Sequence, residues 1–80
     1  MIKNISIIGA GYVGTSLSIL LSQSYKVTII DNDKSKLDLI NSKKSPISDK
    51  LVQEFFNNEK LDINTSSNID TGVKKADLII

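Results

Sequence analysis

The chain has no cysteine, no histidine and no arginine among its 80 residues. Without cysteine there is no disulfide, no thiolate metal site and no cysteine nucleophile within these residues. Without histidine the commonest general base and metal ligand is also missing. The nine Asp and Glu residues show no recognisable metal-ligand spacing. We therefore expect neither a metal site nor a catalytic residue in these 80 residues.

The sequence also has no excess of one charge and no long run of apolar residues. All ten basic residues are lysines, set against nine acids, and the net charge is +1. Pairs such as Lys43-Lys44 and Lys74-Lys75 are isolated, as in solvated loops and helix ends, so no nucleic-acid surface is expected. Gly9, Gly11 and Gly14 interrupt the N-terminal apolar segment, so it is neither a signal peptide nor a membrane span. These features predict a cytoplasmic protein that binds neither nucleic acid nor membrane.

The last residues of the sequence suggest that the polypeptide continues beyond Ile80. Residues 76–80 read as the start of a buried strand, and no turn signal follows them. Natural domains rarely end in mid-strand, because unpaired apolar backbone invites aggregation. Residues 1–80 are therefore expected to be the N-terminal portion of a larger α/β domain.

The chain does contain a glycine-rich turn after its first apolar segment. Residues 3–8 predict a buried parallel strand, and Gly9-Ala10-Gly11-Tyr12-Val13-Gly14 leads into a predicted helix over residues 12–24. Gly9 would allow a sharp turn, Gly11 would let a pyrophosphate approach the backbone, and Gly14 would let the helix lie against the strand. The free amides near Tyr12 and Val13 attract phosphate. The pattern predicts a dinucleotide-binding turn.

An acidic residue follows the second apolar segment, residues 26–30. Asp31 lies close to the offset of roughly 20 residues at which dinucleotide-binding domains place a ribose-binding acid. Its carboxylate would accept hydrogen bonds from the ribose and repel a 2′-phosphate, so NAD is expected rather than NADP. The alternative is that the glycines only shape a tight turn and Asp31 only caps the segment after it. Asp33 is expected to cap the next helix, in which Lys36 either leans towards the adenosine or is solvated.

The remaining segments complete a doubly wound sheet. A helix follows Asp33, and a polar loop over residues 41–48 leads to another helix capped by Ser48 or Asp49. Residues 61–65 predict an edge strand, residues 66–75 a polar connection with a helical turn, and a fourth strand begins at Asp77. The expected fold is α/β, a Rossmann-like doubly wound parallel sheet of strand order 3-2-1-4 that is truncated in its fourth strand. The apolar residues expected to face its core from the first and third helices are Val13, Leu17, Leu20, Leu21, Leu51, Val52, Phe55 and Phe56.

Four segments together resemble the UDP-glucose/GDP-mannose dehydrogenase family. They are Gly11-Tyr12-Val13-Gly14, residues 31–36, Ile40-Asn41 with Ser45-Pro46-Ile47-Ser48-Asp49, and residues 76–80. The resemblance covers all 80 residues without a large gap. Thr65-Ser66-Ser67-Asn68 departs from it, because members commonly have a Thr-containing segment ending in Asp there.

The resemblance implies an activity and a cofactor. Members have two Rossmann-like domains joined by a long helix in each subunit and usually assemble as dimers or larger oligomers, so a homodimer is expected. They oxidise the C6 alcohol of a nucleotide sugar to a carboxylate in two NAD-dependent steps, for capsule and other polysaccharides. The catalytic cysteine and nearly all of the sugar site would lie beyond Ile80, so the 80 residues alone are expected to be inactive. The implied NAD-binding residues are Gly9, Gly11, Tyr12, Val13, Gly14, Asp31 and Lys36.

Two alternatives remain open. UDP-glucose, giving UDP-glucuronate, is the first choice of substrate, and UDP-N-acetylmannosamine or a related amino sugar is the second. A non-catalytic nucleotide-sensing domain, as in the regulatory domains of potassium channels, also pairs a glycine turn with an acid after the second strand. The Ser45–Asp49 loop and the helix carrying Phe55 and Phe56 favour the dehydrogenase.

Overall fold

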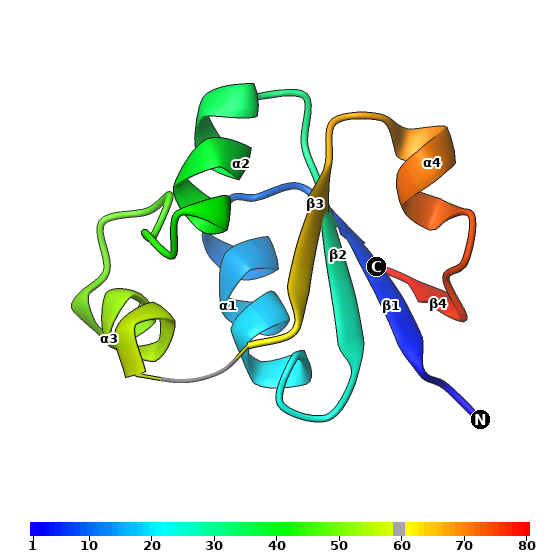
Figure 1. Cartoon of the computed structure of the whole chain (residues 1–80), viewed down its shortest axis with the longest axis horizontal. Helices are drawn as coiled ribbons and strands as arrows, with labels where there is room; N and C mark the ends of the chain where they lie inside the picture. Colours follow the sequence, from blue (N-terminus) through cyan, green and yellow to red (C-terminus); the bar gives the residue numbers. More distant parts are fainter. Residues whose placement is uncertain (59–60) are drawn as a thin grey trace.

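Four parallel strands form one sheet in the order β3-β2-β1-β4 (Figure 1). The computed structural model describes residues 1–58 and 61–80. Within them the predicted α/β fold and strand order are confirmed, with β1 and β2 central and β3 at an edge. The strands are β1 (Asn4–Ile8), β2 (Lys26–Ile30), β3 (Ile63–Ser66) and β4 (Leu78–Ile79).

Helices cover both faces of the sheet. Figure 1 shows α1, α2 and α3 on one side of it and α4 on the other. Because the strands are parallel, their carboxyl ends meet at one edge of the sheet, where the segments after β1 and β2 lie together. The helices are α1 (Tyr12–Leu21), α2 (Lys34–Asn41), α3 (Lys50–Asn58) and α4 (Ile69–Val73).

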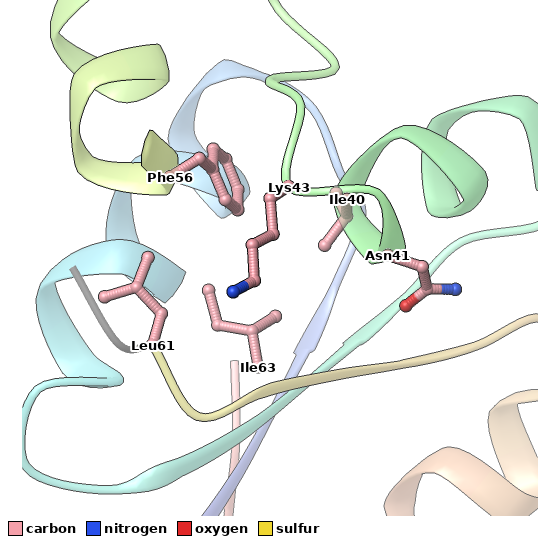
Figure 2. A pocket seen from close by; sticks show the side chains of 6 residues that line it. All are labelled: Ile40, Asn41, Lys43, Phe56, Leu61 and Ile63. Carbon is pink, nitrogen blue, oxygen red and sulfur yellow. The ribbon is translucent and has the colours of Figure 1, made fainter. Parts of the chain in front are cut away.

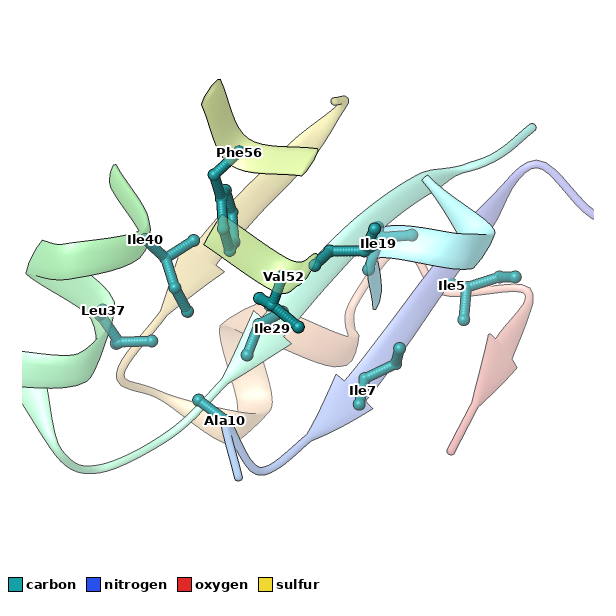
Figure 3. Close-up of a cluster of buried hydrophobic side chains, with 10 residues drawn as sticks. Ile5, Ile7, Ala10, Ile19, Ile29, Leu37, Ile40, Val52 and Phe56 are labelled. Atoms are coloured by element: carbon teal, nitrogen blue, oxygen red, sulfur yellow. The ribbon is translucent and has the colours of Figure 1, made fainter. Parts of the chain in front are cut away.

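The main core lies between the sheet and the helices α1, α2 and α3 (Figure 3). Alternate residues of β1 and β2 point into it, as the period of two along a strand requires. The cluster comprises Ile5, Ile7, Ala10, Ile19, Val27, Ile29, Leu37, Ile40, Val52 and Phe56. The predicted apolar stripe of α3 is only half correct, because Val52 and Phe56 are buried whereas Leu51 and Phe55 are exposed.

The predicted buried face of α1 is wrong at two positions. Val13 and Leu20 are 73% and 65% exposed, while the small residues Thr15 and Ser18 are fully buried. The cause is the close packing of Gly14 on the end of β1, which turns the small side of the helix to the sheet. The hydroxyls of Thr15 and Ser18 are satisfied there, since they donate to the carbonyls of Ala10 and Gly14 at 3.1 and 2.6 Å.

A glycine outside the predicted turn fixes α4 on the opposite face. The buried Ser6 hydroxyl of β1 donates to the carbonyl of Gly72 at 2.6 Å. A Cβ at Gly72 would lie 2.5 Å from Cγ1 of Ile30 in β2. The sequence predicted only a helical turn in this connection, and the role of Gly72 was missed because it depends on this contact between distant segments.

Candidate dinucleotide-binding site

The turn after β1 begins with a glycine in an unusual backbone conformation. Gly9 has a φ of +105°, which L side chains rarely adopt. Its N–H donates to the carbonyl of Ile30 at 2.7 Å, which ties the turn to the end of β2. The predicted structural role of Gly9, a sharp turn out of the strand, is confirmed.

Gly14 holds α1 close to this turn. A Cβ built on Gly14 would overlap the carbonyl oxygen of Gly9 and would lie 3.2 Å from its carbonyl carbon. It would also meet Cγ2 of Ile7 at 3.4 Å. The predicted role of Gly14, close approach of helix and strand, is therefore confirmed as well.

Gly11 differs from both, because the fold itself does not require a glycine there. Gly11 is the N-cap of α1, with φ −80° and ψ −164°, an extended conformation open to any residue. Apart from its neighbours in the chain, no atom lies within 4 Å of a Cβ built on it. It offers no side-chain cap, so the first N–H groups of α1, at Tyr12 and Val13, have no capping partner.

Asp31 binds the turn from the end of β2. Its Oδ2 accepts the N–H of Ala10 and its Oδ1 accepts the N–H of Asp33, each at 2.8 Å. These two bonds, that from Ala10 foremost, hold the pKa of the Asp31 carboxyl below its ordinary value. An ionised carboxylate has about four acceptor positions, so both oxygens can still accept a hydroxyl.

The contact of Asp31 with Ala10 was not found from the sequence, although a signal exists. The parallel pairing of Ile8 with Ile30 sets the residues after β1 level with those after β2. An acid directly after β2 therefore faces the turn directly after β1.

Asp33 and Lys36 flank Asp31 at the start of α2. Asp33 Oδ1 accepts the N–H of Ser35 at 3.0 Å, so its predicted capping role is confirmed. Lys36 is half-buried in the first turn of α2. Its charge adds to the hydrogen bonds from Ala10 and Asp33 in lowering the pKa of Asp31. The structure thus brings Lys36 to the same carboxylate as the glycine turn, while its contact with a cofactor stays a prediction.

A hydrogen bond joins the glycine turn to the loop before α3. The hydroxyl of Tyr12 donates to Oδ2 of Asp49 at 2.6 Å, and Oδ1 of Asp49 accepts the N–H of Val52 at 3.1 Å. The bond to Asp49 raises the pKa of Tyr12, and the bond from Tyr12 lowers the pKa of Asp49. The sequence predicted both residues separately, Tyr12 in the turn and Asp49 as a cap, but not their contact.

A separate pocket of about 120 Å³ lies between α2, α3 and β3, away from the predicted site (Figure 2). None of the predicted cofactor-binding residues belongs to it. It is lined by Ile40, Asn41, Lys43, Phe56, Leu61 and Ile63.

Two features are absent from residues 1–58 and 61–80. No helix in these ranges has the length and apolar character needed to cross a bilayer. Nor do three His, Cys, Asp or Glu side chains gather in these residues as ligands for a metal ion.

Stability is expected to fall in acid through the carboxylates that accept hydrogen bonds. Bonds from the N–H groups of Asn4 and Lys3 lower the pKa of Asp77, as those from Ala10 and Asp33 lower that of Asp31. Both carboxyls have a lower pKa in the folded chain than in the unfolded chain, where the pKa of Asp is about 4. The two ionised carboxylates therefore stabilise the fold fully above about pH 4, and this stabilisation is lost as the pH falls below that value.

The measurement is the midpoint of thermal unfolding, followed by circular dichroism from pH 8 to pH 2. These groups predict little change down to about pH 5 and a fall below about pH 4, which Asp77→Asn should make shallower. A midpoint that rises between pH 4 and pH 2 would contradict this expectation.

The fold and the site together define the class of protein domain. A parallel sheet of order 3-2-1-4, with a glycine turn after β1 and an acid after β2, is the arrangement of Rossmann-type nucleotide-binding domains. The family can be stated as well. The chain belongs to the UDP-glucose/GDP-mannose dehydrogenase family, because residues 3–80 match the sequence model of that family's NAD binding domain. The family resemblance seen in the motifs is thereby confirmed.

Individual relatives agree with this assignment. The chain is 42% identical over 62 residues to the UDP-glucose 6-dehydrogenase of Streptococcus pneumoniae, covering 78% of this chain and 16% of that protein. It is 38% identical over 78 residues to the enzyme of the same name from Campylobacter jejuni, covering 95% of this chain and 20% of that protein. The chain thus spans about a fifth of the length of these relatives.

A solved structure shows the same fold. The UDP-glucose dehydrogenase of the archaeon Pyrobaculum islandicum superimposes with a TM-score of 0.83 at 15% identity, over 99% of this chain and 19% of that one. At this level of identity the likeness concerns the fold alone.

Proposed function

We propose that this chain binds NAD as the cofactor-binding part of a nucleotide-sugar 6-dehydrogenase. The substrate proposed first is UDP-glucose, which would be oxidised to UDP-glucuronate in two NAD-dependent steps. The names of the relatives support this choice, since both the Streptococcus and the Campylobacter proteins are called UDP-glucose 6-dehydrogenases. Bound NAD would accept a hydride from the substrate carbon in each step.

The observation that carries the proposal is the glycine at the N-cap of α1. Serine, aspartate and asparagine stabilise a helix more than glycine at this position. Gly11 has an extended backbone and open space around its missing Cβ, so neither conformation nor packing explains it. A pyrophosphate that approaches the helix amides does explain it, because any side chain would stand in its path.

The other proposed contacts lie at the same edge of the sheet, where the segments after β1 and β2 meet. The N–H groups of Tyr12 and Val13 would bind the pyrophosphate, since no side-chain cap competes for them. Asp31 would accept the ribose hydroxyls with the acceptor positions that Ala10 and Asp33 leave free. The ammonium of Lys36 would lie beside this carboxylate and the adenosine. Gly9 and Gly14 would act indirectly, because they set the path of the turn.

The test is Gly11→Ser in the protein at its natural length. Calorimetric titration should show the Kd for NAD raised at least about tenfold, the equivalent of roughly 1.4 kcal/mol. The midpoint of thermal unfolding should stay the same or rise, since serine is a better N-cap than glycine.

The control is Leu20→Ser, which places a serine on an exposed position of the same helix. It should leave the Kd for NAD unchanged. If the Gly11→Ser variant binds NAD as tightly as the unmodified protein, the proposal is wrong. It is also wrong if the unmodified protein does not bind NAD.

A further inference from the structure

The geometry points to Asp49 as a positioning residue for the cofactor. Through its bond to the phenol of Tyr12, it would hold the first residue of α1 in place beside a bound pyrophosphate. This inference rests on the proposed function of the glycine turn. It differs from that proposal because Asp49 lies in the loop before α3, outside the glycine turn, and its hydrogen bond to the turn is the one from Tyr12.

The anchored side chain starts from the backbone that would bind phosphate. Tyr12 is the first residue of α1, and its N–H is one of the amides without a capping partner. Its side chain is 58% exposed, so packing alone does not select one rotamer. Its hydroxyl is fixed at Asp49, which lies 37 residues further along the chain. This hydrogen bond therefore ties the ring beside the turn to the loop before α3.

The anchor itself is held firmly. Oδ1 of Asp49 accepts the N–H of Val52, and its own backbone N–H donates to the carbonyl of Ile47 at 3.0 Å. The side chain of Gln53, in the first turn of α3, accepts the N–H of Ser45 at 2.8 Å and so closes the loop. The second carboxylate oxygen is thus presented to Tyr12 from a braced position.

The bond is short for an exposed position. A phenol donating to an ionised carboxylate at 2.6 Å falls in the range of charge-assisted hydrogen bonds. A cap for α3 alone needs only one oxygen, which serine would supply equally well. Asp49 has a second oxygen, and that oxygen serves the glycine turn. Ordering the ring before the cofactor arrives removes part of the entropy cost of binding.

The experiment uses the protein at its natural length and compares Tyr12→Phe with Asp49→Ser. The first variant keeps the ring and removes only its hydroxyl. The second keeps the cap of α3 and removes the oxygen that holds the hydroxyl. Each should raise the Kd for NAD about 3- to 10-fold by calorimetry, and the double variant should raise it no further. In steady-state assays the KM for NAD should rise in the same proportion while kcat stays unchanged.

Two variants serve as references. Asp49→Asn should keep most of the affinity, because the amide can cap α3 with its oxygen and donate to the phenol oxygen with its nitrogen. Tyr25→Phe removes a phenol hydroxyl from the other tyrosine, which packs against the core, and should leave the Kd unchanged.

The outcomes separate the two proposals. If the unmodified protein does not bind NAD, the proposed function itself fails. If it binds NAD and the two single variants bind equally well, with only the thermal midpoint lowered, the bond is merely structural and Asp49 has no positioning role. If Tyr12→Phe weakens binding while Asp49→Ser does not, the hydroxyl acts directly and the inference is also overturned.

Discussion

Gly14→Ala should destabilise the fold by about 3 kcal/mol, at the upper end of the usual range for overpacking. The added methyl would overlap the carbonyl oxygen of Gly9. That oxygen belongs to the backbone and cannot rotate away, so α1 itself would have to move off the sheet. The thermal midpoint of the protein at its natural length, followed by circular dichroism, should therefore fall.

Gly11→Ala is the matched control, since it makes the same change in the same turn. A Cβ there meets only open space, and the φ of −80° suits alanine. Gly11→Ala should therefore lower the free energy of unfolding only because alanine is a poorer N-cap than glycine, by about 1 kcal/mol or less. If the two variants unfold at similar temperatures, the close packing of α1 on Gly9 does not determine stability.

Asp31→Ala should weaken both the turn and the binding of the cofactor. The N–H groups of Ala10 and Asp33 would lose a charged acceptor, which is expected to cost about 1–3 kcal/mol of stability. The proposed contact with the ribose would be lost as well, so the Kd for NAD should rise about 10- to 100-fold, or roughly 1.4–2.8 kcal/mol. Discrimination against NADP should shrink, because the charge that repels a 2′-phosphate is gone.

Asp77→Ala is the control that separates the loss of stability from the loss of NAD affinity. Asp77 also accepts two backbone N–H groups, from Lys3 and Asn4 at 2.8 and 2.9 Å, but it lies at the opposite end of β1. Its loss should lower the thermal midpoint and leave the Kd for NAD unchanged. Equal changes of the Kd in both variants would show that Asp31 acts only through stability, and the ribose contact would be refuted.

The sequence predicted those features that local pattern determines. The strand β2 has the predicted bounds, because its apolar run is bordered by polar residues on both sides. The order of strands followed from the buried character of β1 and β2 and the alternation before Thr65. The roles of Gly9 and Gly14 were predictable because each reflects a steric requirement of a strand-turn-helix unit.

Contacts between distant segments were not predictable in the same way. The apolar periodicity of α1 pointed to Val13 and Leu20, but the contact of Gly14 with the turn decides which side of the helix faces the sheet. The bonds of Asp31 to Ala10 and of Tyr12 to Asp49 join residues 21 and 37 positions apart. Such pairs depend on how whole elements pack, which no short window of sequence contains.

The place of β1 in the sheet has a consequence for how the chain is made. This strand is synthesised before the other three, yet one of its two neighbours is β4, and the bond from Lys3 to Asp77 spans 74 positions. On the ribosome β1 can pair with β2 early but keeps a bare edge until residues 77–80 have emerged. Pairing over such a separation is slow, and a bare apolar edge attracts other chains. The growing chain is therefore expected to be most prone to aggregation before β4 is in place.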